Sequence, residues 1–167
     1  HRCFRASPSD AELGYNADYG GEFCMRQTKR EIRQTAQGRQ MYLLYTGDRF
    51  DFGKGESTGG RVQSGLAGIF VLKQVGGGWQ LLAAKPYIEI GTYGVAPEAK
   101  YWSFRQFGRA RWGFMTPMSY LSHGYASSEI LIFTHNGTGK ISESRITTKT
   151  NNGYILDNCR TNRDTGQ

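Results

Sequence analysis

The sequence predicts a mainly β fold, an antiparallel sandwich or a partly closed barrel built from sequential hairpins. The chain has 23 glycines against 4 prolines, and the glycines fall singly or in short clusters between apolar runs, with no fixed period. Many short strands joined by tight turns give this distribution. The apolar runs do not alternate with helical patterns, which argues against a parallel sheet. The length of 167 residues suits one compact domain, so we expect a single domain over residues 1–167.

The N-terminal third of the chain is the least regular. Residues 1–23 are small, polar and acidic, and we expect irregular structure with one turn of helix near residues 9–13, because Ser9 precedes Glu12 as in a capping box. Residues 25–37 combine helix-favouring side chains with a strand-like alternation, and we favour the strand. Residues 41–46 are short, aromatic and bounded by glycines, which predicts a strand. A long loop rich in glycine and charge is expected over residues 48–65.

Three hairpins are expected in the rest of the chain. Each consists of two apolar runs around a short turn, and the Asn136-Gly137 pair in the last turn suits the positive φ angles of a hairpin. The paired runs are residues 66–75 with 79–89, 101–107 with 112–116, and 125–134 with 140–148. Sequential hairpins imply mainly antiparallel neighbours. The tail over residues 155–167 is polar, and we expect only Cys159 to anchor it.

Charge and hydropathy limit the function classes. The formal net charge of +7 would attract nucleic acid, anionic lipid or an acidic protein, although a solvated face is the more frequent explanation of scattered basic residues. No apolar run approaches the roughly 18 to 20 residues of a membrane-spanning helix, so we expect no membrane span. The sequence opens with His1 rather than Met, and we therefore expect a processed or trimmed product.

The cysteines indicate an oxidising compartment. Cys3, Cys24 and Cys159 lack the C-x-x-C spacing of a zinc or thioredoxin-type site. We predict a disulfide between Cys24 and Cys159, which would tie an early segment to the polar tail. The alternatives are three unlinked cysteines, Cys3 as the bridging partner, or Cys3 as a lipid-bearing residue. A disulfide would place the protein in the periplasm or outside the cell.

Common catalytic and cofactor motifs are absent. The sequence has no phosphate loop, no strand-associated G-x-G-x-x-G, no G-x-S-x-G and no H-E-x-x-H, and we expect no cofactor. An acid-base reading would pair His123 with Glu89 or Glu129, but loop histidines and surface carboxylates are the more frequent explanation. His135 lies at the other end of the strand that follows His123, so the two histidines are not expected to share a site.

The long loop carries the weak candidate for a metal site. Asp48, Asp51 and Glu56 could supply oxygen ligands to calcium. Their spacing lacks the order of an EF-hand loop, and neighbouring Lys and Arg residues neutralise them, so we expect no metal.

One predicted hairpin interleaves aromatic side chains with arginines. Its candidate binding residues are Trp102, Arg105, Arg109, Arg111 and Trp112. Such residues can form a protein interface or stack on bases and contact phosphates. Alternatively, the aromatics fill the core of a two-sided sandwich.

The middle of the chain carries a resemblance. The stretch from Gly65 to Tyr125 contains G-L-A-G-I-F-V-L, G-G-W-x-L-L-A-A-x-P-Y-I-E, G-x-Y-G-x-A-P, F-G-R-A-R-W-G-F and H-G-Y. On these glycine and aromatic positions it resembles poorly characterised exported proteins and lipoproteins of Gram-negative bacteria. The resemblance implies an envelope location and transfers no functional residue.

Together these patterns favour a noncatalytic envelope protein that binds another macromolecule. The specific form that we expect is an inhibitor or immunity-type protein with a protein partner, either a toxin or a cell-wall enzyme, and nucleic acid is not the expected partner. The opposing class is a secreted hydrolase or nuclease-like toxin that acts on a polyanion. A cleft that joins His123, Glu89 and Arg105 would favour the enzyme, and an exposed patch without a cleft would favour the binder.

Overall fold

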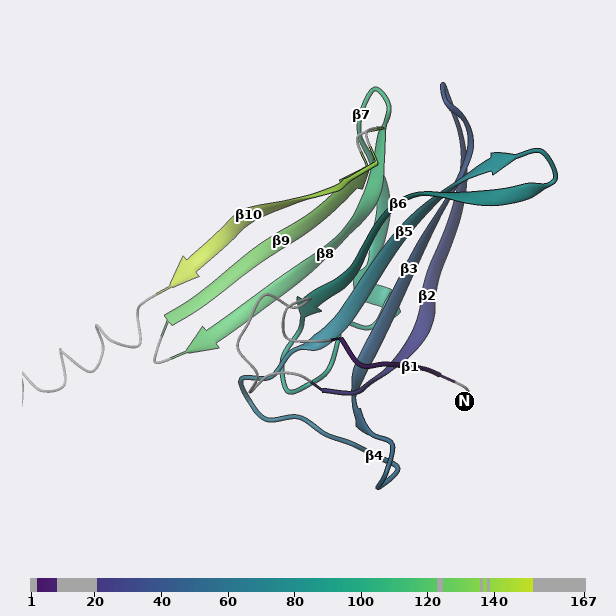
Figure 1. Ribbon diagram of the computed structural model, residues 1–167. Helices are drawn as coiled ribbons and strands as arrows, with labels where there is room; N and C mark the ends of the chain where they lie inside the picture. The colour runs from purple at the N-terminus through teal and green to yellow at the C-terminus, as the bar shows by residue number, and fades with distance from the viewer. Residues whose placement is uncertain (1–2, 9–20, 123–124, 136, 138, 152–167) are drawn as a thin grey trace, which may run out of the picture.

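The computed structural model describes residues 3–8, 21–122, 125–135, 137 and 139–151. These residues form a mainly β fold of two antiparallel sheets, which confirms the predicted fold class (Figure 1). One sheet is curled into a half-barrel. All three predicted hairpins are present, and a further hairpin precedes them.

The first sheet has six strands in the order β1-β2-β3-β5-β6, with β4 paired to the end of β3. Its strands are β1 (Phe4–Ala6), β2 (Phe23–Thr35), β3 (Gly38–Asp51), β4 (Glu56–Ser57), β5 (Gly65–Val75) and β6 (Gly78–Ile90). The ambiguous residues 25–37 therefore form most of a strand, as we favoured. Two expectations are corrected, because β1 lies inside the expected irregular segment and β4 inside the expected loop. Both short strands pair with the end of a longer neighbour.

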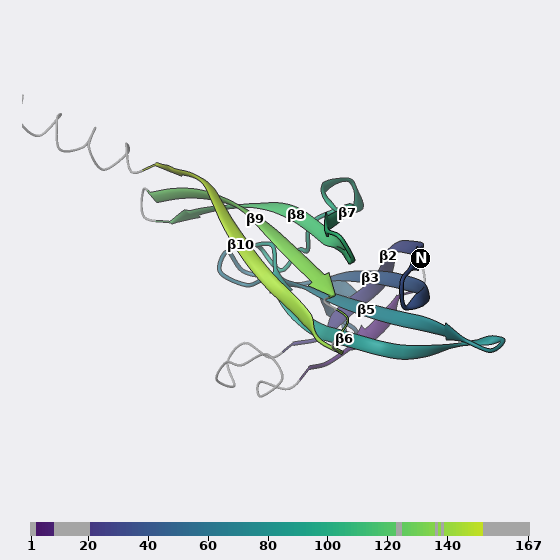
Figure 2. The same ribbon diagram turned by 90° about the horizontal axis from the view of Figure 1, so that it is seen from above.

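The second sheet has four strands in the order β10-β9-β8-β7. Its strands are β7 (Ser103–Gly108), β8 (Arg111–Ser122), β9 (Tyr125–His135) and β10 (Ile141–Asn151), and the short 3-10 helix η1 (Ala99–Tyr101) precedes them. Figure 2 shows β9 and β10 passing over β5 and β6. The predicted helical turn near residues 9–13 and the tail over residues 155–167 lie outside the described residues.

The main core lies between the two sheets. Alternate residues of β3, β5 and β6 point to it from the first sheet, and alternate residues of β8 and β9 meet them from the second. Phe114 and Phe133 lie opposite each other in the β8–β9 ladder, and both are fully buried. Large aromatic side chains thus supply much of the buried apolar area.

The outer face of the first sheet is apolar as well. Leu66 lies in a second buried cluster with Phe23 and Met25, against which Tyr45 and Tyr87 pack. Because residues 41–45 of β3 and residues 66–72 of β5 are continuous apolar runs, they supply side chains to both faces of the sheet.

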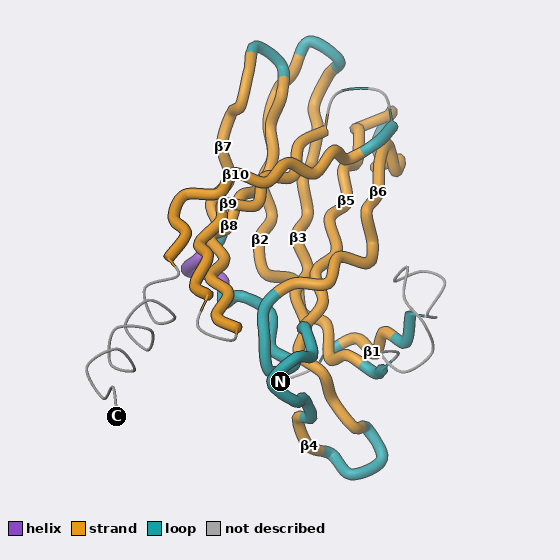
Figure 3. Tube along the Cα trace, turned by 90° about the vertical axis from the view of Figure 1, so that its left-hand side faces the viewer, coloured by secondary structure: helices purple, strands orange, loops and turns teal. Residues whose placement is uncertain are grey.

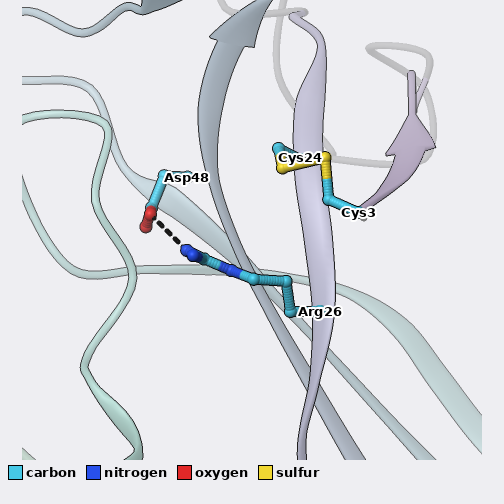
Figure 4. Close-up of a disulfide and its surroundings, with 4 residues drawn as sticks. All are labelled: Cys3, Cys24, Arg26 and Asp48. Atoms are coloured by element: carbon cyan, nitrogen blue, oxygen red, sulfur yellow. Dashed lines mark hydrogen bonds and ion pairs between the residues drawn. A yellow bond between two sulfur atoms is a disulfide. The ribbon is translucent and has the colours of Figure 1, made fainter. Parts of the chain in front are cut away.

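The disulfide differs from the one that we predicted. Cys24 is bonded to Cys3, with 5.2 Å between their Cα atoms, so the Cys24–Cys159 pairing is wrong (Figure 4). The reason lies in the ladder: β1 pairs with β2 and sets Arg5 opposite Cys24, which brings Cys3, two residues before Arg5, close to Cys24. Cys159 lies outside the described residues.

Candidate binding surface

Four hairpin turns lie at the same end of the molecule, which we call the hairpin end. Gln40 pairs with Lys73 near the β2–β3 and β5–β6 turns, and Trp112 pairs with His135 near the β7–β8 and β9–β10 turns. Arg33 of β2 contacts rings of β7 and β8, so the turns of both sheets meet there. Figure 3 shows β4 at the opposite end, toward the bottom.

An aromatic stack joins the two sheets at the hairpin end. The rings of Phe104 and Trp112 stack with 5.4 Å between centroids and 11° between planes. The guanidinium carbon of Arg33 lies 5.1 Å from the centroid of Phe104 and 5.2 Å from that of Trp112. Tyr42 of the first sheet also contacts Phe104, at 5.0 Å. Trp112 therefore has a structural contact that the sequence did not reveal.

Trp102 belongs to the core and not to an exposed surface. It is 2% exposed, its Nε1 donates a hydrogen bond to the carbonyl of Pro97 at 3.1 Å, and its ring lies 6.1 Å from that of Phe133. The structure thus supports the core alternative for Trp102.

Arg105, Arg109 and Arg111 are exposed on the β7–β8 hairpin. Within the described part of the chain, none of the three has a salt-bridge partner. Further cations from both sheets lie near the turns. The basic residues of the hairpin end other than Arg33 are Arg39, Lys73, Arg105, Arg109, Arg111 and Lys140.

The carboxylates near the hairpin end already have partners. Glu31 accepts from Arg33 at 2.9 Å, and Glu143 pairs with Lys85 at 3.4 Å and with Arg145 at 2.9 Å. The other described acids lie further from the four turns, and they are Glu22, Asp48, Asp51, Glu56, Glu89, Glu98 and Glu129. The charge of the protein is therefore asymmetric, with a positive potential at the hairpin end.

The candidates for acid-base catalysis do not come together. Glu89 lies opposite Leu66 on the outer face of the first sheet, whereas Glu129 lies opposite Met118 on the inner face of the second. Arg105 belongs to the second sheet, so the structure does not join it to Glu89. His123 lies outside the described residues.

Glu89 and Arg49 influence each other's pKa. Burial raises the pKa of Glu89, and the positive charge of Arg49 partly offsets this effect. Burial likewise lowers the pKa of Arg49, which is 4% exposed. The Arg49 Nε donates to the carbonyl of Ser64 at 3.1 Å, and its guanidinium lies over Phe23. These contacts give Arg49 a structural role in joining loop to sheet.

His135 is buried in the core and 3% exposed. Its Nε2 atom has no hydrogen-bond partner among the described residues. Burial lowers the pKa of His135 below its ordinary value, because the charged form is poorly solvated there.

The acids proposed for calcium bind protein groups. Asp48 pairs with Arg26 at 2.7 Å, and its Oδ1 accepts the backbone N–H of Ala96 at 3.0 Å (Figure 4). Asp51 Oδ1 accepts the backbone N–H groups of Gly53 and Lys54, and the hydrogen bond from Lys54 is the main reason why the pKa of Asp51 is lowered. Glu56 lies opposite Asp51 in the β3–β4 pair and is exposed. Among the described residues there is no group of three or more metal-ligating side chains.

Comparison with protein-family models, curated proteins and solved structures finds no match to this chain. In the part of the chain that the structure describes, no helix is long and apolar enough to cross a membrane.

Proposed function

We propose that this chain is a noncatalytic binding protein that acts outside the cytoplasm and holds an acidic surface of another protein at its hairpin end. The observation that carries this proposal is the gathering of cations from both sheets at that end, while Glu31 and Glu143 are paired with other cations. Complementary charge favours rapid and selective association with an acidic protein.

The disulfide supports the location. Cys3 and Cys24 are bonded, and such bonds persist mainly in oxidising compartments. The periplasm and the extracellular space are both oxidising, and either would suit an envelope protein.

An inhibitor or immunity-type protein is the specific form of this function that we favour. The β7–β8 hairpin projects Arg109 and Arg111 from the sheet edge, where both are exposed. Glycoside hydrolases carry a pair of carboxylates beside the scissile bond, so their clefts attract a projecting cation. A cell-wall hydrolase would therefore offer the complementary surface that this hairpin requires.

The test is affinity capture from envelope extract at physiological salt, followed by titration of the captured protein in purified form. The variant Arg109→Glu/Arg111→Glu reverses two charges at the hairpin end. Its control is Arg61→Glu/Lys149→Glu, which makes the same net change at exposed sites away from the hairpin turns. We expect the control to bind normally and the hairpin variant to lose at least about 100-fold in affinity.

Equal binding by the two variants would contradict the proposal, as would a failure to capture any protein in the wild-type form. Fluorescence anisotropy with oligonucleotides tests the alternative that the partner is nucleic acid. We expect no binding below about 10 µM at physiological salt, and submicromolar affinity with a steep salt dependence would make nucleic acid the partner.

A further inference from the structure

The outer face of the first sheet contains an apolar groove of about 570 Å³, whereas the exposed arginines of the β7–β8 hairpin belong to the second sheet. Five strands contribute to its lining, and the side chains that define it include Phe4, Leu43, Phe70, Leu72 and Leu81. This volume falls within the range of small-molecule sites.

The sequence builds the groove through β3 and β5. Ile69 and Val71 of β5 point into the core between the sheets, so the alternate residues Phe70 and Leu72 point outward. Leu43 lies directly opposite Phe70 in the ladder and shares its face. The floor is thus a rigid sheet whose other side is fixed by the main core.

Edge strands raise the two sides of the groove. Phe4 of β1 is 67% exposed on one side, and Leu81 of β6 is 58% exposed on the other. The bond between Cys3 and Cys24 fixes β1 beside β2 and so holds the first side in place. Exposed apolar side chains that line a common groove are typical of a ligand-binding site, because a bound ligand removes them from water.

The lining selects for a hydrocarbon chain. The floor is a sheet face, so it presents side chains and not the free backbone groups of a sheet edge. A bound peptide would bury its own N–H and C=O groups without partners at a cost of a few kcal/mol each. A hydrocarbon chain has no such groups, and its burial is favourable in proportion to the area covered.

The rim of the groove nearest the β2–β3 turn is positive. Arg30 lies opposite Leu43 on this face, and its Nε donates to Met41 Sδ at 3.1 Å. Arg39 lies further toward the turn, over the ring of Trp79 at 6.0 Å. Both arginines are exposed, and neither has a salt bridge within the described part of the chain. The opposite end of this face carries Glu89 beside Arg49 instead.

We propose that this groove binds the hydrocarbon chain of a fatty acid, with the carboxylate at Arg30. The tail lies over Phe70 and Leu72 between Phe4 and Leu81. The carboxylate reaches the positive rim, where a guanidinium can hold it with paired hydrogen bonds. The tail lies on the outer face of the first sheet and does not depend on a protein partner, and only Arg39 of the rim also belongs to the hairpin end.

The experiment titrates the full chain with dodecanoate and with the neutral alcohol dodecanol, both below their aggregation limits. Calorimetry gives the affinity, and amide NMR shifts locate the ligand. We expect saturable binding with shifts at Leu43 and Phe70. Leu81→Glu should weaken both ligands by at least about tenfold, because it places a charge in the groove. Ile146→Glu is the matched control, since Ile146 is 51% exposed on the second sheet.

A second variant tests the headgroup. Arg30→Glu should weaken dodecanoate by at least about tenfold and leave dodecanol within about threefold, because only the acid carries charge. Arg61→Glu, which makes the same charge change away from the groove, should leave both ligands unaffected. The proposal fails if neither ligand binds, if Leu81→Glu binds as tightly as Ile146→Glu, or if Arg30→Glu affects acid and alcohol equally.

Discussion

The guanidinium of Arg33 in β2 lies 5.1 Å from the ring centroid of Phe104 in β7, although the two strands belong to different sheets. The guanidinium carbon of Arg33 also lies 5.2 Å from the ring centroid of Trp112, and Arg33 forms a salt bridge with Glu31. No ladder of the described residues joins the two sheets, so side-chain contacts such as this one hold β2 near β7.

Replacement of Arg33 by methionine should destabilise the protein by about 1–2 kcal/mol, because methionine keeps much of the apolar stem but loses the attraction to both rings. The stability of Arg33→Lys should lie between those of the wild-type protein and Arg33→Met, since lysine keeps the charge but lacks the planar guanidinium that stacks on a ring. Urea unfolding measures both effects. Arg109→Met is the control, because Arg109 is exposed, and it should change stability by no more than about 0.5 kcal/mol.

The Cys3–Cys24 bond closes a segment with a sequence separation of 21 residues. In the chain-entropy model, its loss should cost about 3 kcal/mol. We expect Cys3→Ser/Cys24→Ser to unfold at lower urea concentration and to lose the effect of reductant on stability. Cys159→Ser should keep that effect. Peptide mapping of the unreduced protein that joins Cys24 to Cys159 would contradict the pairing.

The hairpins were predictable from sequence because their signals are local. Residues 66–75 and 79–89 are apolar runs around Gly76, Gly77 and Gly78, and they form β5 and β6 nearly as expected. A tight turn between two apolar runs specifies a hairpin without information from the rest of the chain. β1 carried no such signal, because it is short and is held by its pairing with β2 and by the disulfide.

The candidate sites were harder to predict, because they depend on contacts between distant strands. Nothing local to Trp102 distinguishes it from Trp112, yet one is in the core and the other stacks beside Arg33. The apolar groove was missed, although the uninterrupted apolar run over residues 66–72 could have revealed it. Such a run is apolar on both faces of its strand, and only one face can pack against the second sheet.

Gly113 tests the close approach of β8 to β9. A Cβ at this position would overlap the carbonyl oxygen of Phe133, which is backbone and cannot turn aside. We expect Gly113→Ala to destabilise the protein by about 1–3 kcal/mol in urea unfolding. Gly77→Ala is the matched control, since a Cβ at Gly77 meets nothing within 4 Å. If the two variants are equally stable, the Phe133 carbonyl does not lie against the Cα of Gly113 as the structure has it.

His135 should make the stability of the protein depend on pH. Burial lowers its pKa in the folded state below the ordinary 6.5, so above that pH the residue is neutral in both states and contributes no dependence. As the pH falls below 6.5, His135 binds a proton in the unfolded state but stays neutral in the folded state. The free energy of unfolding therefore decreases until the pH passes the folded-state pKa. The slope from one such group is at most about 1.4 kcal/mol per pH unit.

Replacement of His135 by leucine removes both the titration and the unpartnered Nε2. Between about pH 7.5 and pH 5, His135→Leu should therefore lose less stability than the wild-type protein. Glu89 does not produce this difference, because its raised pKa gives a dependence of the opposite sign that is present in both proteins. Urea unfolding at several pH values measures the slopes, and NMR titration of the His135 ring gives its pKa directly. Parallel slopes, or a titration midpoint at or above 6.5, would show that the folded state does not disfavour the charged imidazole.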